Sequence, residues 1–126
     1  CKYSGNVAHY IDEYVKEQNT KCLQDKKIIK KCKKQFLDML AYAEIILGER
    51  GFRKTITSKS TPRARFEALS VGISLALKAD PTLKPKDVTT WIDGMDFAQC
   101  TRSDAANNKS KLKARINFVK NKLLGE

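Results

Sequence analysis

Lysines recur along residues 26–34 at a spacing that suits phosphate binding. The members of this row are Lys27, Lys30, Lys31 and Lys34. Their intervals of three and four residues place them on one face of a helix. Each ammonium is a point charge, and such a row can follow a nucleic-acid backbone. A solvated face of a long helix has the same pattern, so this alternative stays open.

A second basic row lies near the C-terminal end. It is formed by Lys109, Lys113 and Lys120. Neither row is interleaved with aromatic residues, which single-strand binding would use as stacking platforms. Both rows therefore indicate contact with phosphates rather than with bases.

Arginines supply a third set of candidate anion ligands, which comprises Arg53, Arg63 and Arg65. A guanidinium can bind phosphate or carboxylate through two parallel hydrogen bonds. Arg63 and Glu67 stand at i and i+4, so a surface ion pair is the simplest alternative. We favour a folding role for this segment, in which Phe52 and Phe66 fill the core while Arg53 and Glu67 hold the connection between two helices.

The net charge supports an anionic partner. The 126 residues carry a formal charge of +11, with 13 basic and 7 acidic residues in 1–60 and 12 and 7 in 61–126. A field of this sign attracts phosphate backbones at long range. No stretch approaches the 18 consecutive apolar residues that a membrane-spanning helix needs. We therefore expect no membrane partner.

The cysteines do not form a recognisable metal motif. Cys1, Cys22, Cys32 and Cys100 include no CxxC pair, and His9 is the only histidine. Two disulfides in a secreted protein are possible on count alone. Cys32, however, falls on the apolar side of an expected helix, where cysteine behaves as a small core residue. We favour a reduced, cytoplasmic protein.

The sequence contains no recognisable set of catalytic residues. No Ser-His-Asp, Cys-His or clustered-carboxylate arrangement can be assembled with any specificity. Asp93 and Asp96 flank Gly94, but two carboxylates make a poor metal site. We predict no catalytic residues, no metal site and no cofactor.

The apolar residues recur at helical intervals, and no segment alternates as a strand would. We predict an all-α fold, a bundle of five or six helices in one domain over 1–126. The expected elements are helices over 7–18, 26–47, 62–79, about 85–92 and 109–124, with an apolar turn at 95–98. The 26–47 helix carries a core stripe that includes Ile29, Cys32 and Met39. The expected core is Phe36, Leu40, Phe66, Leu69, Ile73, Ile116 and Val119. Ala68, Gly72 and Ala76 would admit a close neighbour.

Three sequence segments together resemble a known family. Residues 47–54 read LGERGFRK, residues 62–77 read PRARFEALSVGISLAL, and the closing helix begins near Asn108. This combination resembles the helical C-terminal region of the GmrSD restriction-endonuclease family. The resemblance implies a ParB-like N-terminal domain elsewhere, which would carry NTP hydrolysis and DNA cleavage in defence against foreign or modified DNA.

The family's catalytic signatures are not present in this chain. The string nearest to its Asp-Gly-Gln-Arg motif is Asp93-Gly94-Met95-Asp96, and one histidine cannot form a His-Asn-His centre. We therefore expect a C-terminal fragment. It would bind DNA non-specifically and pack on the missing N-terminal domain. The alternatives are a structural protein-interaction module without a nucleic-acid role, and a secreted disulfide-bonded helical protein.

Overall fold

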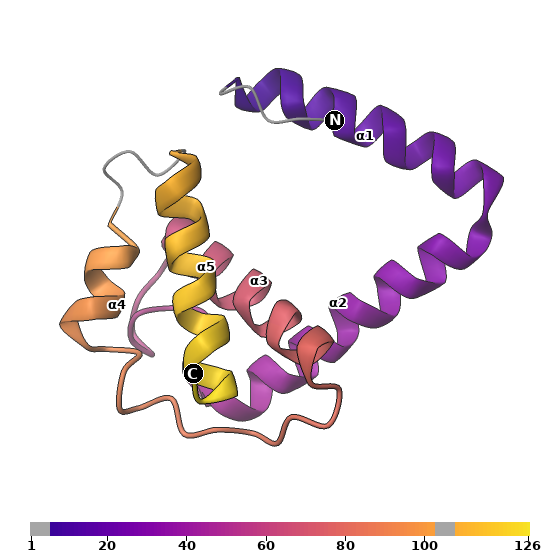
Figure 1. The fold of residues 1–126 in the computed structure, drawn as a ribbon. Helices are drawn as coiled ribbons and strands as arrows, with labels where there is room; N and C mark the ends of the chain where they lie inside the picture. Colours follow the sequence, from indigo (N-terminus) through magenta and orange to yellow (C-terminus); the bar gives the residue numbers. More distant parts are fainter. Residues whose placement is uncertain (1–5, 103–107) are drawn as a thin grey trace. The chain divides into compact units, whose positions relative to one another are not determined.

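The computed structural model describes residues 6–102 and 108–126, and these residues form helices and no strands. The elements are α1 (Val7–Gln24), α2 (Lys26–Leu47), the short 3₁₀ helix η1 (Gly48–Arg50), α3 (Arg63–Ala79), α4 (Met95–Cys100) and α5 (Lys109–Leu124) (Figure 1). The all-α prediction is confirmed. The bounds expected for the helices at 26–47 and 109–124 match those observed.

The chain divides into two compact units, Cys1–Leu37 and Asp38–Glu126. The N-terminal unit holds α1 and residues 26–37 of α2. The C-terminal unit holds the rest of α2 and all later elements. The expectation of a single domain over 1–126 stays a prediction.

In the N-terminal unit, α1 is longer than expected. We predicted that Gln18-Asn19-Thr20 would end it, but the helix continues to Gln24. Local pairs explain the difference. Thr20 donates its hydroxyl to the carbonyl of Lys16 at 3.0 Å, and Lys21 pairs with Glu17 one turn earlier. Such i, i+4 contacts satisfy polar side chains within a helix.

A single extended residue, Asp25, separates α1 from α2. Its carboxylate accepts a hydrogen bond from the backbone N–H of Lys27 at 2.8 Å, as an N-cap does. The helix predicted at 26–47 therefore begins at a side-chain cap.

None of the described residues of the N-terminal unit is buried. Ile29 is 52% exposed, Phe36 is 55% exposed and the thiol-bearing Cys32 is also exposed. The prediction that these three residues face the core is wrong. The helical period was identified correctly, but no described element of this unit covers the stripe.

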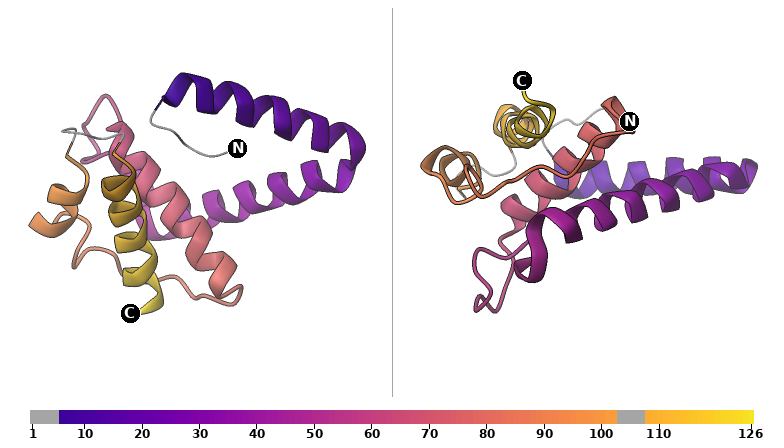
Figure 2. Two further views of the ribbon diagram at one scale, coloured as in Figure 1. Left: turned by 45° about the horizontal axis from the view of Figure 1, so that its top comes forward. Right: turned by 90° about the horizontal axis from the view of Figure 1, so that it is seen from below.

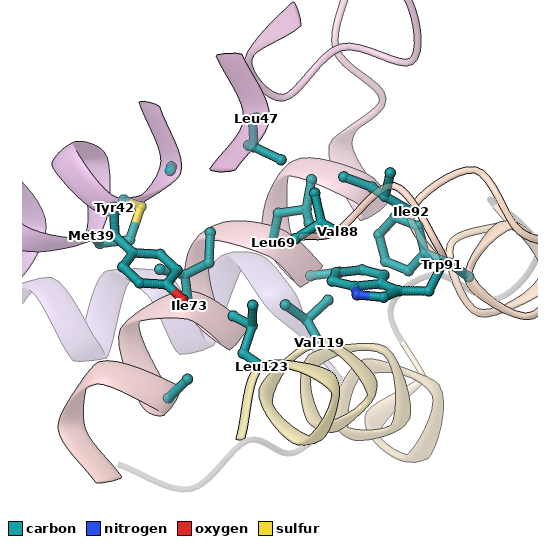
Figure 3. Close-up of a cluster of buried hydrophobic side chains, with 14 residues drawn as sticks. Met39, Tyr42, Leu47, Leu69, Ile73, Val88, Trp91, Ile92, Val119 and Leu123 are labelled. Atoms are coloured by element: carbon teal, nitrogen blue, oxygen red, sulfur yellow. The ribbon is translucent and has the colours of Figure 1, made fainter. Parts of the chain in front are cut away.

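The core lies in the C-terminal unit. Its buried apolar residues include Met39, Tyr42 and Leu47 from α2, Leu69 and Ile73 from α3, and Val119 and Leu123 from α5. Figure 3 shows these side chains converging with Val88, Trp91 and Ile92. Leu69, Ile73 and Val119 are buried as predicted, whereas Leu40 and Ile116 are only partly buried.

Helices α3 and α5 lie side by side (Figure 2). Gly72 makes this possible, because a Cβ at that position would stand 2.6 Å from the Cβ of Val119. Ala68 and Ala76 are fully buried on the same helix. The predicted close approach is confirmed.

Phe66 is 43% exposed, so its predicted place in the core is wrong. Its ring meets the edge of Phe52 at a centroid distance of 4.9 Å, and Phe52 is the partner that packs on the core. On α3, Ala64, Ala68 and Leu69 take the inward positions instead. The motif places one aromatic ring inward and one at the rim.

Residues 80–94 form turns rather than the helix expected at 85–92. Two Asp-x-Thr turns shape this segment: Thr82 donates its N–H and hydroxyl to Asp80, and Thr89 does the same to Asp87. Such side-chain bonds offer the backbone an alternative to a helix. The apolar turn predicted at 95–98 is instead the helix α4, in which Phe97 is fully buried and Met95 is 88% exposed.

Candidate nucleic-acid interface

The α2 lysine face consists of Lys27, Lys30, Lys31 and Lys34. The Asp25 cap begins the helix just before these residues, and all four side chains are exposed. Residues 1–37 contain 9 basic and 4 acidic residues, so this unit is itself strongly basic. The face can therefore meet a row of phosphates without first rearranging the fold.

The lysine row on α5 is less uniform. Lys109 and Lys113 are exposed, whereas Lys120 is half-buried. The neighbouring Lys122 places its ammonium 5.6 Å from the centroid of the Phe118 ring. Arg115, on the same helix, points inward. This row offers two open charges, fewer than the α2 lysine face.

Arg53 holds the connection after η1, as predicted. Its guanidinium donates to three backbone carbonyls, those of Arg50 at 3.1 Å, Ile56 at 2.9 Å and Glu49 at 2.9 Å. These bonds occupy all three of its nitrogen atoms. Phosphate contact by Arg53 stays a prediction, but the geometry favours a role in shaping the loop. Arg63 is exposed at the start of α3.

Arg65 is buried, with 4% of its surface exposed. Its Nε donates to the carbonyl of Phe52 at 3.2 Å and its Nη1 to that of Ile92 at 3.1 Å. The guanidinium also lies over the Phe97 ring, 5.3 Å from the centroid. Its Nη2 is buried without a hydrogen-bond partner. Arg65 thus joins the two long connections of this unit.

Glu67 pairs with α5, a contact that the sequence did not indicate. Its Oε2 accepts from Nε of Arg115 at 3.0 Å and also from Nη2. The Arg115 side chain is 3% exposed and that of Glu67 is 35% exposed. This ion pair crosses the α3–α5 interface. The expectation that Glu67 holds the connection before α3 is therefore wrong.

A second ion pair, between Arg50 and Asp93, links the two long connections of this unit. Arg50 Nη1 donates to the two carboxylate oxygens at 3.0 and 2.7 Å and to the carbonyl of Lys54 at 3.3 Å. The same carboxylate lies 3.9 Å from Nη2 of Arg65. Burial lowers the pKa of Arg65, the nearby Arg50 lowers it further, and Asp93 raises it.

Arg50, Arg65 and Asp93 line an open cleft of about 1150 Å³ within the C-terminal unit. Lys54 and Arg102 add positive charge, and part of the wall is apolar, including Ile56, Val88 and Ile92. Sequence reasoning missed Arg50, Arg102 and Asp93 as members of one site. These residues are far apart in the sequence, so their spacing could not predict the cluster. The one available signal was Arg50, which comes just before the Phe52-Arg53-Lys54 string.

Other kinds of site find no support in the described part of the chain. Residues 6–102 and 108–126 contain no group of three or more His, Cys, Asp or Glu side chains that could hold a metal ion. None of the described helices is long and apolar enough to cross a membrane. Cys22, Cys32 and Cys100 are free thiols, and Cys1 lies outside the described residues.

Comparisons with protein-family models, with curated proteins and with solved structures find no match.

Proposed function

We propose that this chain is a non-catalytic helical domain of a GmrSD-like DNA restriction and defence protein, and that it binds duplex DNA through the α2 lysine face without sequence preference. The observation that carries the proposal is the exposure of all four lysines on one face of one helix. Lys109 and Lys113 form a secondary contact.

The physical basis is counterion release. Duplex DNA holds condensed cations, and each lysine that pairs with a phosphate releases one of them. The affinity then depends on salt and hardly on sequence. The exposed lysines suit this mode, because ammonium groups on flexible stems recognise charge rather than base edges.

Replacement of Lys27, Lys30, Lys31 and Lys34 by Gln tests the proposal. Glutamine is a good helix former, so α2 should persist. We expect weaker duplex binding for every DNA sequence. The slope of log K against log salt should shrink by about 0.9 for each lost contact. Fluorescence anisotropy with a labelled duplex at several salt concentrations measures both quantities.

A matched control removes the same charge elsewhere. Lys59, Lys78, Lys84 and Lys86 are exposed lysines of the C-terminal unit, and their replacement by Gln also removes four charges. This variant should keep most of the affinity and slope. Equal losses in the two variants would show that net charge alone attracts DNA. Binding unchanged by either variant, or no salt-dependent binding by the unmodified chain, would refute the proposal.

A second candidate function is protein interaction, favoured by the exposed apolar side chains of the N-terminal unit. Ile11, Phe36 and Leu37 are 51%, 55% and 50% exposed. Phe36 and Leu37 are neighbours in α2, and contiguous exposed apolar surface marks interaction sites. The occupant that we propose is an apolar surface of the ParB-like domain of the same cytoplasmic protein. The double variant Phe36→Ser with Leu37→Ser should bind less of the dye ANS, which reports exposed apolar surface. Its duplex affinity should stay unchanged. ANS binding equal to that of the unmodified chain would argue against an apolar docking face.

A further inference from the structure

Among the described residues that line the cleft of the C-terminal unit, cations outnumber carboxylates. Among the described residues, the cations Arg50, Lys54 and Arg65 line it beside one carboxylate, that of Asp93. Arg65 is the most buried of these residues, with 4% of its surface exposed. Buried charges in proteins are paired, because an unpaired one loses its hydration without compensation. An anion is therefore the complementary ligand.

The Arg65 guanidinium provides an independent indication. Two of its nitrogens donate to the carbonyls of Phe52 and Ile92, whereas its buried Nη2 has no hydrogen-bond partner. The Asp93 carboxylate lies 3.9 Å from this nitrogen, beyond hydrogen-bond distance. A buried donor without an acceptor is costly. One oxygen of a bound anion, in place of the carboxylate, would satisfy it.

Two guanidiniums are held ready for such a ligand. The stacking of Arg65 on Phe97 and its two carbonyl bonds restrict its orientation. Arg50 is held by the carbonyl of Lys54 and presents the same Nη1 to Asp93. Paired arginines of fixed orientation suit a phosphate group, which has several acceptor oxygens. The Asp93 carboxylate, whose side chain is 60% exposed, occupies the position that such a phosphate would take.

We propose that the cleft binds a phosphate monoester of a small molecule, with Arg50 and Arg65 on the phosphate and the apolar wall of Ile56, Val88 and Ile92 beside the body of the ligand. The bound phosphate displaces the Asp93 carboxylate. The volume of about 1150 Å³ exceeds the requirement of inorganic phosphate and accommodates a body as large as a drug-sized ligand. This site is separate from the α2 lysine face and requires no nucleic acid.

Isothermal titration calorimetry with inorganic phosphate and with phenyl phosphate, at ionic strength matched by sodium chloride, tests the assignment. We expect saturable binding of both, with phenyl phosphate tighter because its ring meets the apolar wall. Asp93→Asn removes the competing negative charge and should raise the affinity by about tenfold. Arg50→Gln should lower it by about tenfold or more.

Two controls separate this site from the DNA-binding proposal. Asp96→Asn makes the same charge change at an exposed residue that does not line the cleft, and should leave the affinity unchanged. The Gln variant of the α2 lysine face should also bind phosphate as the unmodified chain does. Loss of phosphate binding in the lysine variant together with its retention in Arg50→Gln would overturn the assignment.

A second measurement keeps the proposal testable if Arg50→Gln does not fold. In NMR spectra of the unmodified chain, phenyl phosphate should shift the side-chain Nε–H signals of Arg50 and Arg65 and the amide of Asp93. Shifts confined to lysines 27–34, or no saturable shift in either the unmodified chain or Asp93→Asn, would overturn it. Equal affinities for phosphate and phenyl phosphate would remove the apolar wall from the site.

Discussion

The two units use amphipathic helices in different ways. In the C-terminal unit, the apolar faces of α3, α5 and the end of α2 enclose one another, and fifteen of the described residues are apolar and buried. In the N-terminal unit, α1 and residues 26–37 of α2 have the same three- and four-residue apolar spacing, yet none of the described residues is buried. This difference in burial decides which side chains are held by packing and which are exposed to solvent.

The comparison shows that a periodic apolar stripe predicts a helix but not its cover. Isolated helices are marginal in water, because most helical stability in proteins comes from packing. The C-terminal unit supplies that packing and can hold charged groups such as Arg65 in fixed positions. In the N-terminal unit, Lys27, Lys30, Lys31 and Lys34 and several large apolar side chains are exposed to solvent.

Matched leucine substitutions should sharpen the contrast most. Leu69 is fully buried in α3, and Leu37 is 50% exposed in α2. Leu69→Ala should lower the free energy of unfolding by about 2–5 kcal/mol, since it leaves a cavity. Leu37→Ala should change it by no more than about 0.5 kcal/mol. Urea unfolding followed by circular dichroism measures both, and equal losses would break the comparison.

Removal of the charge on Glu67 should have the next largest effect. Arg115 is almost fully buried, so Glu67→Gln removes a counter-charge from a buried guanidinium. We expect a loss of about 3 kcal/mol, towards the low end for a buried pair because Glu67 is partly exposed. The exposed pair of Glu17 and Lys21 in α1 is the control. Glu17→Gln should change the stability far less, because solvent screens an exposed pair on a helix surface. A neutral Glu67→Gln would deny the ion pair its structural role.

Gly72→Ala tests the α3–α5 contact directly. Inside an exposed helix this change would stabilise by about 1 kcal/mol. Here the new Cβ would meet Val119 at 2.6 Å and the carbonyl of Ile116 at 3.1 Å. We therefore expect a net destabilisation of about 1–3 kcal/mol in thermal or urea unfolding. Ser74→Ala, on the same helix, is the control and should be close to neutral. A stabilised Gly72→Ala would show that α3 and α5 pack less closely.

The smallest effect should appear in acid. Hydrogen bonds from the Thr82 hydroxyl and N–H lower the pKa of Asp80 from 3.8, and those of Thr89 do the same for Asp87. A lowered pKa in the folded state means that the stabilisation is present at neutral pH. It is lost as the pH falls below 3.8 and through the folded-state pKa. The double variant Asp80→Asn with Asp87→Asn should therefore show a flatter fall of Tm below pH 4. An unchanged pH profile would contradict the role of these two turns.

The sequence was a good guide to the helices and a poorer one to their environment. The 26–47 helix was predicted with its observed bounds, because Asp25 and Gly48 bracket a clear periodic pattern. Phe36 was wrongly assigned to the core. Periodicity shows which side of a helix is apolar, but not which residues on that side another element covers. The turns at 80–94 were missed because side-chain bonds of Asp80 and Asp87 compete with helix formation.

The candidate sites divide in the same way. The α2 lysine face could be read from four lysines within one helix, where spacing alone fixes the shared side. The cleft could not, because Arg50, Arg65, Asp93 and Arg102 come from four separate segments. Arg65 was predicted as a candidate anion ligand, which stays a prediction, but its burial depends on the tertiary contacts with Phe52, Ile92 and Phe97.

The central claim is that stability resides in the C-terminal unit while DNA contact resides in the α2 lysine face. Amide hydrogen exchange, read residue by residue with and without duplex DNA, tests both parts. In the free protein, we expect the amides of Leu69, Ile73 and Val119 to exchange slowest and those of residues 26–37 far faster. Duplex DNA should slow exchange at 26–37. Protection of 26–37 equal to that of α3 in the free protein, or slowing by DNA that spares 26–37, would contradict the account.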